Sequence, residues 1–134
     1  MVQAYNYQKM KRTNKDKSFK GKLKDFQKFS GYFIGQFMGE RGFPILETDE
    51  VEITYKKLPE KFEEERPHYH KKGVEVNIVI KGKYKAQVNG ENVEISSNEF
   101  LVVYPRSTLK NISAQKGTEL IVVKAPSVAK DKFQ

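Results

Sequence analysis

The sequence predicts an all-β protein, an antiparallel jelly-roll β-barrel with a basic N-terminal arm. Two observations lead to this prediction. Beyond about residue 30, short segments rich in β-branched and aromatic residues alternate with Gly, Pro and Asn-Gly turn signals. No segment shows the sustained periodicity of an amphipathic helix. The resulting count of about eight short strands suits a barrel or sandwich, and a jelly roll fits best.

The length and the charge distribution predict one folded domain with an arm. A chain of 134 residues, 37% of them hydrophobic, can bury one core but is too short for two ordinary domains. The net charge of +8 is concentrated at the start, where residues 1–30 hold nine Lys or Arg and two Asp. We therefore predict a basic, partly flexible arm over residues 1–30 and the barrel over residues 31–134. A solvated lysine-rich arm explains this charge more simply than nucleic-acid binding, so we expect no nucleic-acid partner.

Composition restricts the location of the protein and the chemistry open to it. There is no cysteine, so a bound metal would need nitrogen and oxygen ligands. Apolar runs such as residues 100–104 are far shorter than the roughly 20 residues that cross a bilayer, so we expect no membrane span. The basic start is not followed by the apolar region and cleavage site of a secretory signal. By default we expect a cytoplasmic protein.

The first predicted elements precede Pro59. Residues 21–28 permit a short helical turn, because apolar side chains recur three residues apart. Residues 31–38 are rich in aromatic and β-forming residues and predict a strand, which the Gly- and Pro-containing segment 39–44 ends. Residues 51–55 alternate apolar with polar side chains, so we expect a strand whose apolar face is buried.

The remaining predicted strands follow at short intervals. Residues 75–81 and 83–88 predict two strands joined at Gly82. Asn89-Gly90 is the strongest hairpin signal in the chain, because a type I′ turn needs positive φ at both central residues. Further strands are predicted over residues 92–96, 100–104, 109–113 and 119–124.

A short segment near the middle of the chain carries the residues most suited to metal binding. The only two histidines, His68 and His70, are two residues apart, so on a strand both side chains point to the same face. Glu75 follows after a four-residue loop and opens the next predicted strand. Two imidazoles and a carboxylate at one point suit Fe, Mn, Ni or Zn as a divalent ion, with positions left open for a substrate. A surface pair of histidines with no ligand is the alternative.

These residues resemble the first sequence motif of the cupin superfamily. That motif has two histidines separated by one residue, then three or four residues before a glutamate, and six further residues before a glycine. The matching residues are His68, His70, Glu75 and Gly82. The glycine that usually opens the motif is replaced by Phe62. The resemblance covers roughly residues 50–125, and it implies a small jelly-roll barrel with the ligands facing inward, a small-molecule ligand and a homodimer.

The second cupin motif is degenerate in this chain. Pro105 matches it, but Glu99 and Ser107 occupy its glycine positions, and Lys110 occupies the position of the histidine that is the usual fourth ligand. Three alternatives stay open for Lys110. Its side chain points away, or it pairs with Glu75 in a metal-free pocket, or it has a lowered pKa and acts as acid, base or nucleophile.

The predicted catalytic residues are Lys110 and Asn77. Asn77 lies two residues beyond Glu75, so on a strand it shares the inward face and becomes a candidate for supporting the ligands or contacting substrate. The resemblance implies two functions between which the sequence does not choose. One is a metal-dependent enzyme, dioxygenase-like or isomerase-like, acting on a small polar molecule, with carbohydrate-related chemistry as one candidate. The other is a non-catalytic, metal-free cupin that binds a small ligand.

Overall fold

The structure, a computed structural model, describes residues 18–134. The first part of the predicted arm, residues 1–17, lies outside the described residues. The described elements are η2 (Leu23–Phe29), β1 (Tyr32–Ile34), η3 (Pro44–Leu46), β2 (Glu52–Lys57), β3 (Phe62–Glu64), β4 (Tyr69–His70), β5 (Val74–Lys81), β6 (Lys83–Val88), β7 (Glu91–Ser96), β8 (Phe100–Val103), β9 (Leu109–Ala114), β10 (Glu119–Ala125) and β11 (Lys132–Phe133). Both described helices are short 3-10 helices, and neither has the length and apolar character that a membrane span requires.

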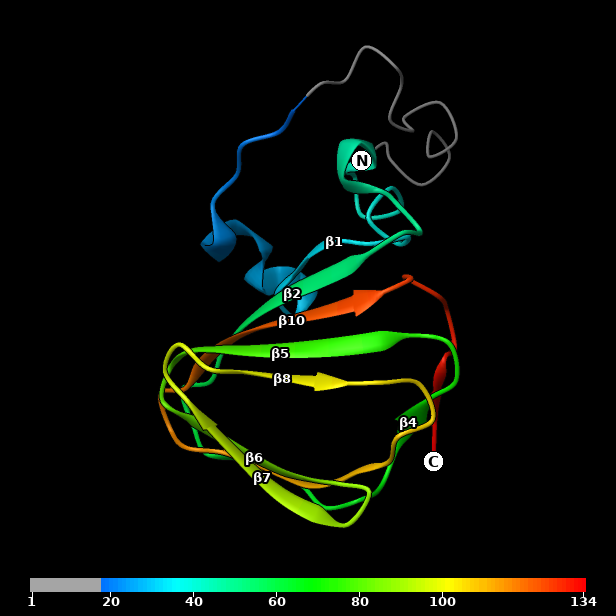
Figure 1. Cartoon of the computed structure of the whole chain (residues 1–134). Coiled ribbons are helices and arrows are strands. Elements are labelled where there is room, and N and C mark those ends of the chain that lie inside the picture. The colour runs from blue at the N-terminus through cyan, green and yellow to red at the C-terminus, as the bar shows by residue number, and fades with distance from the viewer. Residues whose placement is uncertain (1–17) are drawn as a thin grey trace.

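Two antiparallel sheets form the barrel (Figure 1). The five-stranded sheet has the order β1-β2-β10-β5-β8 and lies above the four-stranded sheet, of order β3-β9-β6-β7, in that view. The short strands β4 and β11 pair with each other at one end, where the C-terminus lies. The strand pairs within both sheets are antiparallel, which confirms the predicted all-β jelly-roll barrel.

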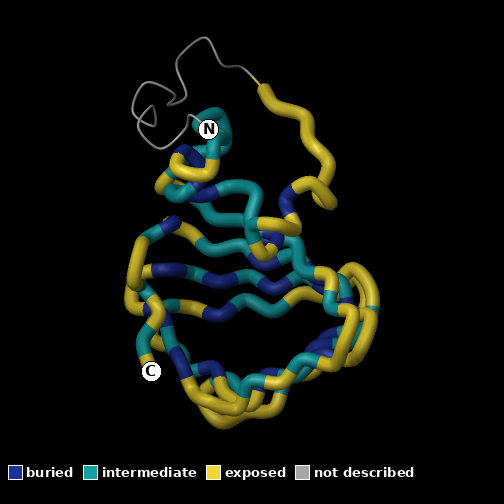
Figure 2. Tube along the Cα trace, turned by 180° about the vertical axis from the view of Figure 1, so that it is seen from behind, coloured by how far each residue is buried: buried dark blue, intermediate teal, exposed yellow. Residues whose placement is uncertain are grey.

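The core fills the space between the two sheets, and buried residues alternate with less buried ones along the strands (Figure 2). Its apolar part consists of Val79, Tyr84, Ala86, Ile95, Val103, Leu109, Ile112, Leu120 and Val122. At one end of β5 the same inward face is polar, since Glu75 and Asn77 are buried there. A barrel interior with buried charged groups needs partners for them, so this end of the core is the place to look for a site.

Most strand predictions are confirmed. β2 and β5 to β10 match the predicted segments, with ends that differ by at most two residues. Asn89 and Gly90 have φ angles of 50° and 87°, as the predicted type I′ turn requires. Gly82 joins β5 to β6 with φ 95°, and a Cβ there would lie 2.8 Å from the Cα of Thr118. The glycine of the motif is therefore required both by backbone angle and by space.

The strand predicted over residues 31–38 is wrong beyond Ile34. β1 has three residues, and the chain then turns, with the N–H of Met38 donating to the carbonyl of Gly35 at 3.2 Å. Met38 is fully buried within this turn, and the ring of Phe37 packs edge-on against Tyr32. The aromatic and β-forming side chains here fill a compact turn, which is why composition suggested a longer strand.

The inward face of β2 is the opposite of the one expected. Thr54 is 2% exposed and Lys56 points into the barrel interior, whereas Ile53 and Tyr55 are only half-buried on the outer face. Alternation correctly predicted a strand here, but the assumption that its apolar face is the buried one was wrong. The five-stranded sheet therefore presents polar groups to the interior and apolar groups to the outside over part of its area.

The described part of the predicted arm packs on the barrel. η2 overlaps the helical turn predicted at residues 21–28 but begins two residues later. Its Phe26 is buried beside Phe29, Phe33 and Phe43, with a ring-centroid distance of 5.0 Å to Phe43. These aromatic contacts fix the segment next to β1. The boundary between arm and barrel at residue 30 remains a prediction.

Candidate functional site

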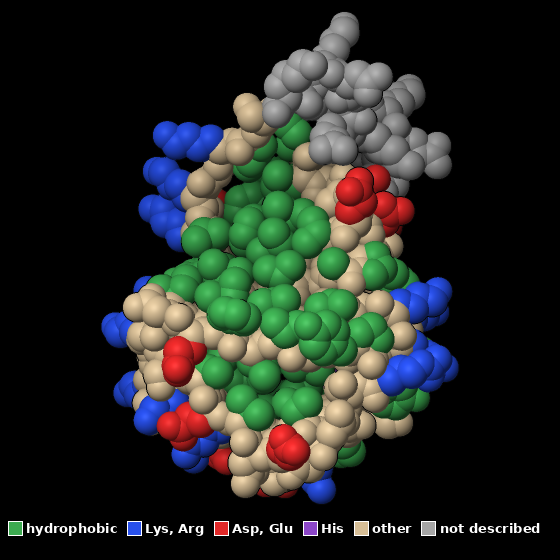
Figure 3. Space-filling view, viewed as in Figure 1, with side chains coloured by type: hydrophobic (Ala, Val, Ile, Leu, Met, Phe, Trp, Pro, Cys, Tyr) green, Lys and Arg blue, Asp and Glu red, His purple; other side chains and the backbone are tan. Residues whose placement is uncertain are grey.

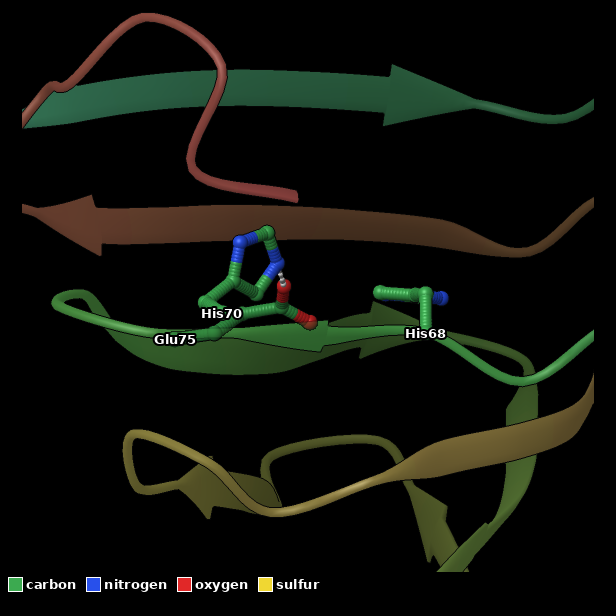
Figure 4. Close-up of side chains that lie close together, drawn as sticks. All are labelled: His68, His70 and Glu75. Atoms are coloured by element: carbon green, nitrogen blue, oxygen red, sulfur yellow. Dashed lines mark ion pairs between the residues drawn. The ribbon is translucent and has the colours of Figure 1, made fainter. Parts of the chain in front are cut away.

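His68, His70 and Glu75 converge inside the barrel, where β4 leads into β5 (Figure 4). His70 is the last residue of β4 and Glu75 the second of β5. His68 precedes β4 and is fixed to Leu109 of β9 by two backbone hydrogen bonds of 2.9 and 2.8 Å. All three side chains are buried, and one ligand atom from each lies within 4.8 Å of the other two. The structure thus brings together the three residues of the motif.

The turn between the histidines and the glutamate is held by the C-terminal segment. The carboxylate of Asp131 accepts hydrogen bonds of 3.0 to 3.3 Å from the backbone N–H groups of residues 71–73. The same carboxylate lies 4.0 Å from Nδ1 of His70. Strand pairing adds to this contact, because Lys132 of β11 lies opposite His70. Asp131 therefore fixes the loop whose two ends carry His70 and Glu75.

Glu75 is ionised despite its position in the interior. Burial opposes its ionisation, but the Nε2 of His70 at 3.2 Å, a 2.8 Å hydrogen bond from Nδ2 of Asn77 and the charge of Lys124 outweigh burial and lower its pKa to about 2. Lys124 lies directly opposite Glu75 on the neighbouring strand. Near neutral pH the site therefore contains a carboxylate anion that can act as a ligand.

The two imidazoles contain buried nitrogen atoms without a hydrogen-bond partner among the described residues. They are Nδ1 of His68 and Nε2 of His70. Carboxylate oxygens of Glu64 and Glu75 lie 3.4 and 3.2 Å away, but they are not aligned for a hydrogen bond. Burial, followed by the charge of Lys132, lowers the pKa of His68, so its imidazole is neutral and keeps a lone pair near pH 7. Buried polar atoms without a partner are uncommon, so these two nitrogen atoms are candidates to bind an ion or a ligand.

The donor set fits a divalent transition metal. Two imidazoles and one carboxylate are the nitrogen and oxygen donors that such ions accept. Donor atoms that lie about 2.1 Å from one ion are at most about 4.2 Å apart. Three donors around one tetrahedral ion are closer still, about 3.4 Å apart, so donor atoms that lie within 4.8 Å of one another would have to close by up to about 1.4 Å.

Two hollows meet at these residues. The inner cavity, of about 120 Å³, lies within the barrel, and the outer cleft, of about 530 Å³, lies beside it. The inner cavity is lined by Lys56, His68, Glu75, Asn77, Tyr84 and Ile112, among others. The outer cleft is lined by Gln36, Arg41, His70, Glu75, Ala129 and Lys130, among others. Since Glu75 lines both, a small molecule in either hollow lies next to the cluster.

Asn77 and Lys110 have different positions relative to this cluster. Asn77 is 2% exposed and lines the inner cavity beside the ligands. Lys110 is exposed and is not among the described residues that line the inner cavity or the outer cleft. β9 loses its alternation at Asn111, whose φ is 52°, so that Leu109 and Ile112 are the inward residues. Of the alternatives open for Lys110, the structure has the one in which its side chain points away.

Sequence reasoning missed the lysine that does enter the barrel. Lys56 follows Thr54 on the inward face of β2 and lines the inner cavity. Burial and then the charge of Lys124 lower its pKa. Thr54 and Lys56 are two residues apart and therefore lie on the same face of the strand. Lys56 was missed because we expected the other, apolar face to be the buried one.

Comparison with known proteins identifies the fold. No protein-family model matches the chain, and no curated protein matches its sequence. Solved structures do match: the nucleoside dehydratase Pac13 from Streptomyces has a TM-score of 0.55 at 13% identity, over 63% of this chain and 68% of that one. KdgF from Halomonas sp. has a TM-score of 0.54 at 16% identity, over 61% of this chain and 74% of that one.

A cupin protein from Bacteroides fragilis also matches, with a TM-score of 0.51 at 19% identity, over 65% of this chain and 75% of that one. At such low identities these likenesses concern the fold alone. Together with the strand order, they show that this chain has the cupin, or double-stranded β-helix, fold. The resemblance inferred from the histidine motif is confirmed at the level of the fold.

Proposed function

We propose that this cupin-fold protein holds a divalent transition-metal ion through His68, His70 and Glu75 and acts on a small polar molecule. The observation that carries the proposal is the pair of buried imidazole nitrogens without hydrogen-bond partners among residues 18–134, next to an ionised carboxylate. Iron, manganese, nickel and zinc all accept this donor set. Three protein ligands leave coordination positions free for a substrate.

The surrounding residues determine how such a site works. A bound ion would supply Lewis-acid chemistry or activation of dioxygen, as in isomerases and dioxygenases. Asn77 orients the Glu75 carboxylate through its 2.8 Å hydrogen bond, and Asp131 holds the loop between His70 and Glu75. Ligands fixed in this way lose little freedom on binding, which raises affinity for the ion.

The size of the outer cleft supports a small-molecule substrate. Its volume of about 530 Å³ lies within the roughly 300 to 1,000 Å³ typical of small-molecule pockets. Pac13, which shares the fold, is a nucleoside dehydratase and has been solved with uridine, a molecule that contains a sugar. We keep carbohydrate-related chemistry as the candidate reaction class on this basis.

Metal content tests the proposal. Purified protein is stripped with chelator, incubated in turn with Fe, Mn, Ni and Zn, desalted and subjected to elemental analysis, together with His68→Ala, His70→Ala and Lys110→Ala. We expect about one ion per chain in wild type and in Lys110→Ala, and less than about a tenth of that in the histidine variants, because each loses one of three ligands. A wild type that retains none of the four metals would contradict the proposal and favour the metal-free ligand-binding alternative.

We also propose that the protein is a homodimer formed through the outer face of the five-stranded sheet. Two rows of residues opposite one another across four strands form this outer face: Tyr55, Ile121, Ile78 and Phe100, and Ile53, Val123, Val76 and Val102. Phe100 is 65% exposed, and Figure 3 displays a broad apolar area over these strands. An exposed apolar area marks an interface, and rows of apolar side chains can be complementary to their own copy about a twofold axis.

A further inference from the structure

Three lysines line the inner cavity. They come from different strands, Lys56 from β2, Lys124 from β10 and Lys132 from β11. Lysine is among the residues least often buried, because removing an ammonium group from water is costly unless a partner compensates for it. Lys132 is exposed to water, so this cost falls mainly on Lys56 and Lys124, which are partly buried.

Two of these lysines have partners within the protein. Nζ of Lys124 lies 3.8 Å from Glu52, which is its neighbour across the sheet. Nζ of Lys132 lies 3.9 Å from Glu64. These ion pairs account for the presence of both charges at the site.

Lys56 has no such partner among the described residues. No carboxylate of residues 18–134 forms an ion pair with it. Burial and the charge of Lys124 both disfavour its ammonium form, and the charges of Glu75 and Glu64 offset only part of this effect, so that its pKa is lowered. An anion placed beside Lys56 would supply the missing partner.

The charge of the whole cavity points the same way. Its lining contains three lysines and two glutamates, Glu64 and Glu75, and Glu52 pairs with Lys124 from outside the lining, so the charges balance when all are ionised and no metal is bound. A divalent ion on the proposed ligands would add two positive charges. In a low-dielectric hollow this excess would favour an anion beside the ion.

We propose that the inner cavity binds the carboxylate group of a small organic acid, with Lys56 as its principal partner. This inference rests on the proposed function and names the substrate class of that site. Thr54 and Asn77 line the cavity between the levels of Lys56 and Glu75 and offer a hydroxyl and an amide to the same group.

The shape of the site suits an acid of modest size. The inner cavity, about 120 Å³, has room for a carboxylate with a few carbon atoms. Apolar side chains cover part of its wall, which suits the carbon chain of such an acid: Leu58, Phe62, Ile112, Ala114, Leu120 and Val122. Tyr32, Glu75, Lys124 and Lys132 line both hollows, so the rest of a larger acid can extend into the outer cleft.

Calorimetric titration with malonate tests this inference, with malonamide as its uncharged analogue and inorganic phosphate as a second anion. Wild type, Lys56→Met, Lys56→Arg and Lys57→Met are compared, each metal-free and zinc-loaded. Lys57 is the matched control, because it is the next residue of β2 and is exposed. Circular dichroism and thermal unfolding establish that each variant is folded.

We expect wild type to bind malonate more tightly than phosphate and at least about tenfold more tightly than malonamide. Lys56→Met should weaken malonate binding at least about tenfold, Lys56→Arg should restore most of it, and Lys57→Met should change it less than about twofold. Equal affinity of wild type and Lys56→Met for malonate would overturn the inference, as would equal binding of malonamide or a preference for phosphate.

The outcomes separate this inference from the metal proposal. If the protein takes up no metal, but the metal-free form binds malonate through Lys56, then the metal proposal fails and the carboxylate site stands. If metal binds through His68 and His70, but Lys56→Met keeps its affinity for malonate, then the carboxylate site fails and the metal proposal stands.

Discussion

Single residues in this barrel keep or lose charge according to their nearest neighbours. Burial alone favours the neutral form of every ionisable group in the interior. Glu75 remains ionised because Asn77 and His70 contact its carboxylate, whereas His68 is neutral because burial prevails. The result is a carboxylate and an imidazole lone pair side by side, which is the state that a metal ion requires.

The pKa of Glu75 predicts an acid-sensitive contribution to stability in the metal-free protein. Its folded value of about 2 lies below the usual 4.5, so the stabilisation is complete above about pH 4.5 and is lost as the pH falls through about 2. The difference corresponds to on the order of 3 kcal/mol. Urea denaturation between pH 6 and 2.5 should show this loss in wild type and in the exposed control Glu60→Gln. A similar loss in Glu75→Gln would contradict the prediction.

Asn77 is predicted to support the metal ligands. Asn77→Leu preserves side-chain size but removes the donor to Glu75, so we expect metal affinity to fall about tenfold with the same number of ions per chain. Competition with a chromophoric chelator measures this affinity, and Asn92→Leu on the exposed part of β7 is the control. Unchanged affinity in Asn77→Leu would mean that the carboxylate is oriented by other groups.

Residues close together in the chain could be predicted, and residues brought in by the fold could not. His68, His70 and Glu75 lie within eight consecutive positions, so strand geometry alone indicated their convergence. Asp131 and Lys56 reach the site from distant segments through strand pairing. Strand parity could place Lys56 on one face of its strand, but no local pattern shows which distant residues that face meets.

Among the elements, β4, β5 and β11 form the frame of the site. β4 and β11 are only two residues long, too short for an alternating pattern, and their pairing depends on contacts from the C-terminal segment. Asp131 lies just before β11 and fixes the loop between β4 and β5. The position of the ligands therefore depends on the end of the described chain.

Asp131→Ala is predicted to loosen this frame. It removes the acceptor of three backbone N–H groups, so we expect a loss of about 1–3 kcal/mol in the free energy of unfolding and weaker metal binding. Urea denaturation and chelator competition provide the two measurements, and Asp49→Ala, at an exposed position, is the control. A variant with wild-type values in both would show that the loop holds its shape without this carboxylate.

β2 illustrates how an alternating pattern can predict an element but not its orientation. The rule that the apolar face is buried holds for a sheet with one face on the core and the other exposed to solvent. Here the side of β2 that carries Thr54 and Lys56 faces a polar cavity, and the side with Ile53 and Tyr55 continues an apolar outer face. The inner face of β2 is polar because it lines a polar cavity. Its outer face is apolar because it belongs to the apolar outer face of the sheet.

At the scale of the whole molecule, the polar cavity and the apolar outer face belong to the same sheet. β2, β10 and β5 carry Lys56, Lys124 and Glu75 inward, while their intervening residues form the apolar rows on the outside. Such an arrangement favours a second copy that covers the outside while the mouth of the barrel stays open.

Phe100→Glu is predicted to produce monomers. A charge at this 65% exposed position would have to be buried without a partner in the dimer, whereas a monomer leaves it in water. Light scattering coupled to size-exclusion chromatography gives the mass, and Lys116→Glu, in an exposed loop, is the control. A wild type that is monomeric at about 100 µM, where a standard dimer interface is occupied, would contradict the dimer proposal.

The cupin fold could be predicted because its signals are repeated along the chain. Turn residues such as Asn89-Gly90 and Pro105 mark the strand ends, and the histidine motif indicates which side chains at the start of β5 face inward. The strand order and the depth of the cavity depend on side-chain packing between the two sheets, which a single sequence does not display.

We propose above that His68, His70 and Glu75 hold one metal ion. The most direct measurement is anomalous diffraction from crystals of the zinc-loaded or manganese-loaded protein. We expect a single peak about 2.0–2.2 Å from a nitrogen of each histidine and an oxygen of Glu75. Metal-loaded crystals without a peak at this position, with the ion bound elsewhere on the protein, would show that these three residues are not the ligands.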